Sequence, residues 1–127
     1  MPQYDTAYFD PPAPLAEVAL VNPLTGSTLT KVMMLIDTGA DVTLLPKQAV
    51  SSLEIGSMSN VVYQIQGFGG SVQFAESIEC QMLFLGKRFK GKFLLIDEPI
   101  GILGRNILNA LPLIFDGPKQ QWDELKR

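Results

Sequence analysis

The chain has 127 residues, of which 46% are hydrophobic, enough for one domain to bury a core without disulfides or bound metals. Ten basic and thirteen acidic residues give a net charge of −3, which favours neither nucleic acid nor an anionic membrane as a partner. One cysteine and no histidine exclude an intramolecular disulfide, Ser-His or Cys-His catalysis and an ordinary zinc site, so we expect neither a metal nor a cofactor.

The sequence has no stretch of roughly twenty apolar residues, the length that a helix needs to cross a membrane. Its first residues lack the basic and apolar regions of a secretion signal, so we expect a cytoplasmic protein. Cys80 lies within an apolar strand pattern, which indicates a buried, inert thiol rather than a reactive one.

Residues 1–14 are rich in proline and show no apolar periodicity, which predicts an extended or loosely ordered N-terminal arm. Tyr4, Tyr8 and Phe9 could pin this arm to the body or to a partner chain. We expect the remaining residues, 15–127, to form one domain.

The first part of this domain alternates short apolar segments with turn residues. Residues 15–21 and 29–36 predict two antiparallel strands, joined by the turn-forming residues 22–27. Residues 42–45 predict a short strand, and residues 46–53 predict one or two helical turns, because proline is well placed at the first helical position.

A glycine-rich segment separates the next two predicted strands, 61–66 and 71–75, in which apolar and polar residues alternate. The pattern predicts a hairpin with a flexible tip, from which one aromatic side chain projects. The tip consists of Gly67, Phe68, Gly69 and Gly70.

Strands are predicted again at 78–85 and 89–96, and an apolar segment at 100–108 passes from a strand into a short helix. A strand at 113–115 follows, and residues 120–125 fit either a return strand or a frayed helix. Many short strands with one or two small helices predict an all-β fold in a single domain.

Asp37 stands where the apolar run 32–36 ends, and small residues follow it. A carboxylate beside an apolar strand is costly to charge, and carboxyl groups in such settings often do chemistry. The alternative is a structural Asx turn, in which Asp37 merely accepts hydrogen bonds from nearby amides.

The segment LIDTGAD at 35–41 resembles the catalytic loop of the retropepsins, the retroviral-type aspartic proteases. The segment ILGRNIL at 102–108 resembles the second hallmark of that family, and the glycine-tipped hairpin lies between the two. The resemblance implies the acid protease fold, a closed β barrel with one short helix near the C-terminus. The hairpin predicted at 113–125 resembles the tail of cellular and bacterial relatives, whereas the retroviral enzymes end soon after the helix.

An aspartic protease needs two carboxylates that share one proton, so that one activates a water while the other protonates the scissile carbonyl oxygen. This sequence has one Asp-Thr-Gly. Its other Asp-Gly pair, Asp116-Gly117, is followed by a proline in a predicted turn and is not a second copy of the motif. The resemblance therefore implies a homodimer, to which each chain contributes the catalytic residues Asp37, Thr38 and Gly39.

The resemblance also assigns residues to substrate binding and to support of the site. The substrate-binding residues are Leu35, Ala40, Asp41, Leu44, Gly67, Phe68, Gly69, Gly70, Pro99, Ile100 and Ile102, and the supporting residues are Gly104, Arg105 and Asn106. Arg105 begins a helix, where the macrodipole disfavours a cation, so we expect Asp41 to compensate its charge. The alternative is that both are ordinary solvated charges.

These features favour an aspartic endopeptidase that cleaves peptide bonds flanked by apolar residues, with the hairpin at 61–75 closing over the peptide as a flap. The alternative is a catalytically silent module of the same fold that dimerises or binds peptides. Tyr8-Phe9 in the N-terminal arm also suits such a cleft, which makes self-processing there a third, minor hypothesis.

Overall fold

The computed structural model describes residues 2–53, 62–66 and 72–126, and of residues 62–66 and 72–75 it describes the backbone. Its elements are β1 (Leu15–Val21), β2 (Thr28–Ile36), β3 (Leu44–Pro46), α1 (Lys47–Ser51), β4 (Val62–Gln66), β5 (Val72–Phe84), β6 (Lys87–Ile96), β7 (Gly101–Leu103), α2 (Arg105–Leu108), β8 (Leu113–Asp116) and β9 (Gln121–Glu124). Each predicted strand overlaps a strand of the structure, although the two predicted at 71–75 and 78–85 form the single strand β5, and both helices are about one turn long.

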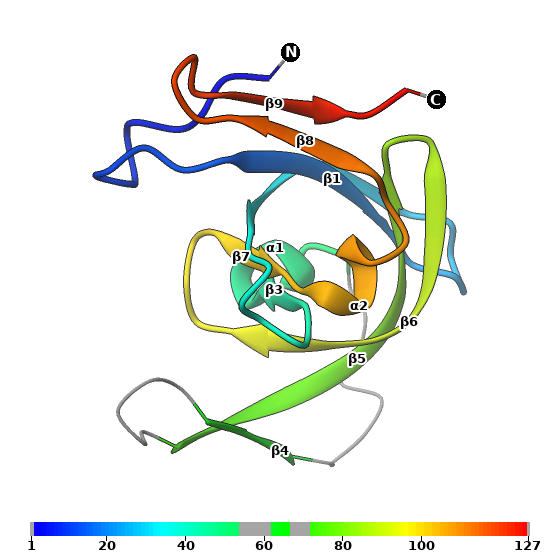
Figure 1. Ribbon diagram of the computed structural model, residues 1–127. Coiled ribbons are helices and arrows are strands. Elements are labelled where there is room, and N and C mark those ends of the chain that lie inside the picture. The colour runs from blue at the N-terminus through cyan, green and yellow to red at the C-terminus, as the bar shows by residue number, and fades with distance from the viewer. Residues whose placement is uncertain (1, 54–61, 67–71, 127) are drawn as a thin grey trace.

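The main sheet curls into a closed barrel (Figure 1). Its strand order is β1-β2-β7-β3-β6-β5-β4, and an additional pairing of β1 with β5 closes the ring. β4 stays outside the ring, as the partner of the first part of β5. Closure removes free strand edges from the barrel and lets the strands share one apolar interior. The prediction of a single all-β domain with a closed barrel is confirmed.

The β1–β2 hairpin follows the alternation of its sequence. Ala16, Val18 and Leu20 of β1 are buried, and the residues between them face outward or lie near the surface. The pairing register shifts between Val18 and Leu20, and Lys31 on the opposite strand has a φ of 60°. A local irregularity of this kind increases the twist of a strand pair, which a closed barrel requires.

β5 is one strand of 13 residues, whereas the sequence predicted two strands at 71–75 and 78–85. Its antiparallel partner changes along its length, from β4 to β6. Because a partner is present on both sides of the expected break, the backbone stays paired and needs no turn there. The turn into β6 uses Leu85 and Gly86, both with positive φ, which is the geometry of a tight hairpin.

β7 lies between β2, to which it runs parallel, and β3, to which it runs antiparallel. The packing there is close, since a Cβ on Gly101 would lie 2.5 Å from both the Leu44 carbonyl oxygen and Met34 Sδ. Parallel neighbours end at the same edge of a sheet. The residues after β2, beginning with Asp37, therefore lie beside the residues after β7, beginning with Gly104.

The C-terminal hairpin β8–β9 lies beside the N-terminal arm, at the opposite end of the molecule from the β4–β5 hairpin (Figure 1). Trp122 of β9 is 2% exposed, and its Nε1 donates to the Leu15 carbonyl oxygen at 2.9 Å. Gln121 forms an isolated bridge with Gln3 of the arm. Of the two alternatives for residues 120–125, the return strand is therefore the correct one.

Cys80 is buried in β5, and burial raises the pKa of its thiol from 9.0 to about 12. The cause is desolvation, because an apolar interior disfavours the charged thiolate. A thiol that stays protonated is a poor nucleophile, in agreement with the predicted inert role.

Candidate active site

Asp37 leaves the end of β2 in a tight, hydrogen-bonded loop. Its backbone N–H donates to the Leu103 carbonyl oxygen at 3.1 Å, and its own carbonyl oxygen accepts from the Ala40 N–H at 3.2 Å. The Gly39 N–H donates to Asp37 Oδ1 at 2.8 Å. In the part of the chain that the structure describes, Oδ2 has no hydrogen-bond partner. The Asx-type bond of the structural alternative is thus present, and it orients one carboxylate oxygen while the other stays available.

Gly39 is required by the position of that carboxylate. A Cβ at Gly39 would lie 3.1 Å from Asp37 Oδ1, tighter than most contacts of real Cβ atoms. A side chain there would push the carboxylate or the amide away from its present position. Gly39 therefore leaves room for the Asp37 carboxylate of the same chain in the position where its own N–H can donate to Oδ1.

Thr43 joins the loop after β2 to the loop after β7. This hydroxyl donates to Asn106 Oδ1 at 2.7 Å and accepts from the Gly104 N–H at 3.0 Å. The side chain is 1% exposed, so both bonds are sheltered from water. Thr43 is not among the site residues predicted from the sequence, although a hydroxyl in the apolar run 42–45 is a usable signal, because a buried polar group needs partners.

Gly104 allows the two loops to meet. A Cβ there would overlap the backbone of Val42, lying 2.5 Å from its carbonyl carbon. The next residue continues the contact, since the Arg105 N–H donates to the Ala40 carbonyl oxygen at 2.8 Å. The supporting residues expected from the resemblance, Gly104, Arg105 and Asn106, thus all contact the segment that follows Asp37.

The guanidinium of Arg105 finds a different partner from the one expected. Its Nη1 donates to the Thr38 carbonyl oxygen at 2.8 Å, and among the described residues no ion pair joins it to Asp41, which is exposed. The expectation assumed a helix dipole at Arg105, but α2 has four residues and aligns few peptide units. The guanidinium therefore stabilises the loop through a hydrogen bond to a backbone carbonyl of the Asp-Thr-Gly segment.

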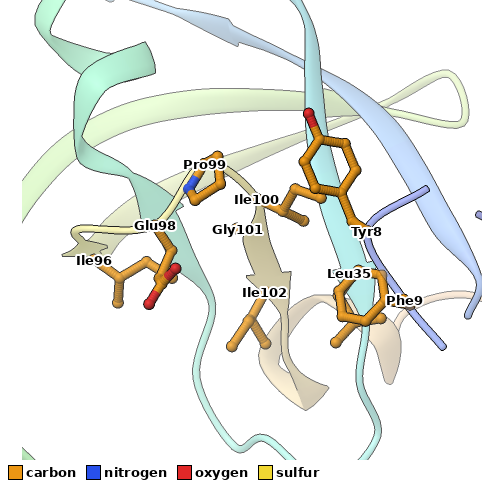
Figure 2. A pocket seen from close by; sticks show the side chains of 9 residues that line it. All are labelled: Tyr8, Phe9, Leu35, Ile96, Glu98, Pro99, Ile100, Gly101 and Ile102. Carbon is orange, nitrogen blue, oxygen red and sulfur yellow. The ribbon is translucent and has the colours of Figure 1, made fainter.

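An apolar cavity of about 300 Å³ lies beside this loop (Figure 2). Its lining residues are Tyr8, Phe9, Leu35, Ile96, Glu98, Pro99, Ile100, Gly101 and Ile102. Four of the predicted substrate-binding residues, Leu35, Pro99, Ile100 and Ile102, therefore meet in one pocket. We call it the side-chain pocket.

The side-chain pocket begins two residues before the carboxylate along the chain. Leu35, which lines the pocket, lies on β2, and Asp37 is the first residue after this strand. Ile102 is the direct neighbour of Leu35 in the β2–β7 pairing. A peptide side chain in this pocket would thus be close to the aspartate loop.

The other predicted substrate residues have different surroundings. Leu44 is buried against Leu94, with Ile102 packed nearby, and is not part of the pocket lining. Ala40 is half-buried in the aspartate loop. The predicted flap tip, Gly67, Phe68, Gly69 and Gly70, lies outside the described residues, although the antiparallel pairing of β4 with β5 is described.

A second cavity, of about 200 Å³, lies between the aspartate loop and the C-terminal hairpin. Its lining residues are Ile36, Thr38, Arg105, Leu108, Asn109, Leu111, Leu113 and Phe115.

Among the described residues there is no cluster of three or more His, Cys, Asp or Glu side chains that could hold a metal ion. Within the same residues, none of the helices has the length and apolar character needed to cross a membrane.

Comparison with known proteins adds to this geometry. A family model described as retroviral aspartyl protease matches residues 12–114, which include both motifs and the hairpin between them. Among solved structures, EIAV protease complexed with the inhibitor HBY-793 is similar, with a TM-score of 0.53 and 26% sequence identity, over 84% of this chain and 91% of that chain. The match covers most of the chain, and the chain belongs to the retroviral aspartyl protease family.

Proposed function

We propose that this protein is an aspartic endopeptidase, active as a homodimer, that cleaves peptide bonds flanked by apolar residues. The observation that carries the proposal is the Asp37 carboxylate. Gly39 holds one of its oxygens, the other has no partner in the described chain, and Leu35, two residues before Asp37, lines an apolar pocket. Family membership supports the reaction class.

Two copies are needed because each chain has one Asp-Thr-Gly. Two carboxylates at about 3 Å cannot both ionise, so they share a proton. The ionised carboxylate takes a proton from the attacking water, and the protonated carboxyl donates to the scissile carbonyl oxygen. Water adds to the carbonyl carbon, and the tetrahedral intermediate then breaks its C–N bond as the nitrogen gains a proton.

The C-terminal hairpin offers the second copy a docking surface next to the aspartate loop. Ile114, Phe115 and Leu125 are exposed by 45%, 41% and 45%, on the two sides of this hairpin, and we call this exposed apolar surface the β8 face. In the described sheets β8 pairs with β9 alone, so its other edge has no strand partner. Thr38 and Phe115 line the same cavity, so a two-fold axis near Asp37 would also bring the β8 faces together.

The substrate would bind as an extended peptide above the aspartate pair, with an apolar side chain in the side-chain pocket. The β4–β5 hairpin extends away from the barrel in Figure 1, which suits a flap that closes over the bound peptide. Closure would exclude bulk water and press the scissile bond toward the carboxylates.

The deciding experiment replaces Asp37 with Asn, which keeps the shape of the side chain and removes its ability to share a proton. We expect peptide cleavage to fall by about 10³-fold or more, with the circular dichroism spectrum and the mass in solution unchanged. A statine-type inhibitor should block the native protein. As a matched control, Glu79→Gln removes the charge of an exposed carboxylate on β5, outside the site, and should retain cleavage.

The substrates are unfolded casein and a mixed peptide library, tested between acid and neutral pH at several protein concentrations. Cleavage that survives in Asp37→Asn would overturn the proposal. So would a confirmed dimer of the native protein that cleaves nothing, which would instead support a silent peptide-binding module.

A further inference from the structure

The N-terminal arm forms a closed loop rather than a free tail. The Asp5 N–H donates to the Ala13 carbonyl oxygen at 2.7 Å, and the Ala13 N–H donates back to the Asp5 carbonyl oxygen at 3.1 Å. The Tyr8 N–H donates to Asp5 Oδ2 at 2.7 Å. We call residues 5–13 the N-terminal loop. Its base is paired in both directions, which limits the positions that its tip can take.

The loop is also tied to the body of the protein at both ends. Before it, the Tyr4 N–H donates to the Gln120 carbonyl oxygen at 2.8 Å, and Tyr4 packs against the hydrophobic core. After it, the Pro14 carbonyl oxygen accepts from the Ile36 N–H at 3.0 Å, one residue before Asp37. The loop is therefore positioned by the same strand that carries the aspartate.

The tip of the loop carries two aromatic residues to the side-chain pocket. Figure 2 shows Tyr8 and Phe9 on one side of the pocket and Ile96, Glu98 and Pro99 on the other. Phe9 is half-buried, whereas Tyr8 is 66% exposed, although its ring is large and mostly apolar. The family match begins at residue 12, so these two pocket residues lie outside the matched segment.

We propose that the N-terminal loop is a wall of the substrate pocket, and that Tyr8 and Phe9 determine which side chain next to the scissile bond is accepted. The inference rests on the proposed function and deepens it. A pocket of about 300 Å³ is at the small end of ligand sites, so each ring in its wall takes a large share of the contact with a bound side chain.

The chemistry of the wall defines the accepted class of side chain. Eight of the nine lining residues carry no charge, and the ninth, Glu98, is acidic. The pocket therefore favours an aliphatic or aromatic side chain of moderate size. It disfavours an aspartate or glutamate, because an apolar wall does not solvate a carboxylate and the acidic Glu98 would repel it.

The test measures kcat/KM for a set of fluorogenic peptides that differ in one residue next to the scissile bond: Ala, Leu, Phe, Trp and Glu. The proteins compared are the native chain, Tyr8→Ala, Phe9→Ala and the double variant. Thr6→Ala is the matched control, since Thr6 is exposed on the same loop and does not line the pocket.

With both rings removed, the Leu peptide loses contacts while the Trp peptide gains room. We expect the ratio of kcat/KM for Leu to that for Trp to fall by about tenfold or more in the double variant, with smaller changes in the single variants. Thr6→Ala should leave the ratio unchanged. A ratio within twofold of the native value in the double variant, in a protein of native circular dichroism and mass, would overturn the inference.

A second measurement separates this inference from the proposed function. Statine-core peptides with the same series of side chains are titrated by calorimetry into the native and variant proteins. Suppose that the native protein cleaves no substrate, while its preference among these ligands depends on Tyr8 and Phe9. This result would support the inference and contradict the proposed function. If the double variant cleaves peptides with the native preference, the result contradicts the inference alone. If the alanine variants fail to fold, Phe9→Leu tests the same ring with less loss of packing.

Discussion

Two regions beside Asp37 are built in opposite ways. The loop at 37–43 is fixed within one chain, by hydrogen bonds to residues 103–106 and by glycines that admit close backbone contact. The β8 face, in contrast, exposes large apolar side chains on a strand with one described neighbour. The loop is held together within one chain, whereas the β8 face and the single carboxylate are the features that the proposed second copy would complete.

The difference predicts which substitutions change folding and which change association. The two hydrogen bonds of Thr43 that hold the loop are buried or partly buried, so breaking one leaves an unsatisfied group in the interior. Exposed apolar side chains cost the monomer little and gain stability when a partner covers them. Substitutions in the loop should therefore change the stability of the folded chain, and substitutions on the β8 face should change association.

The largest effect is expected at Gly104. A Gly104→Ala substitution places a Cβ against the backbone of Val42, which cannot move like a flexible side chain. We expect a loss of about 3 kcal/mol in the free energy of unfolding, measured by urea denaturation. Gly91→Ala is the control, because a Cβ there would contact nothing within 4 Å. Equal losses in the two variants would contradict the assigned close contact.

The next effect is expected at Thr43. A Thr43→Val substitution keeps the shape but removes the hydroxyl, leaving the Gly104 N–H and Asn106 Oδ1 without this partner. We expect a loss of about 2 kcal/mol in the free energy of unfolding. Thr30→Val, at an exposed position on β2, should change it by no more than about 0.5 kcal/mol. A Thr43→Val protein as stable as the native one would show that the two loops are held in another way.

On the β8 face, Ile114→Lys should weaken association instead of folding. A charge on an apolar edge must be desolvated when a partner covers it, so we expect the dissociation constant of the dimer to rise by about tenfold or more. Analytical ultracentrifugation over a range of concentrations measures this constant, and cleavage should become more dependent on concentration. Leu24→Lys is the control, since Leu24 is 84% exposed on a distant turn. A native dissociation constant in Ile114→Lys would place the interface elsewhere.

The smallest effect on stability at neutral pH is expected from the ionisation of Cys80. The pKa of this thiol is about 12 in the folded chain, against 9.0 ordinarily, so the folded state keeps its proton where the unfolded state loses it. Its contribution to stability is fully present below pH 9 and decreases as the pH rises from about 9 to 12. A thiol reagent should react quickly in urea and slowly without it at neutral pH. Fast labelling of the native protein would contradict the burial.

Much of the fold could be predicted from the sequence because it depends on near neighbours. The alternation in β1, the turn residues between β1 and β2 and the glycine-tipped hairpin are local patterns, and the structure contains the corresponding strands. The division of β5 into two strands was wrong because its continuity depends on partners from β4 and β6. The pairing of Arg105 with Asp41 assumed a helix dipole that a single turn does not provide.

By itself, the sequence determined the order of most strands along the chain and the Asp-Thr-Gly turn, because each rests on residue types within a few positions of one another. The tertiary structure alone decided that Thr43 forms hydrogen bonds with Gly104 and Asn106, which lie 61 and 63 positions further along the chain. It also decided that the tip of the N-terminal loop lines the side-chain pocket. The physical reason is that apolar periodicity reports which face of a strand is buried. It contains no information on which distant segment will cover that face.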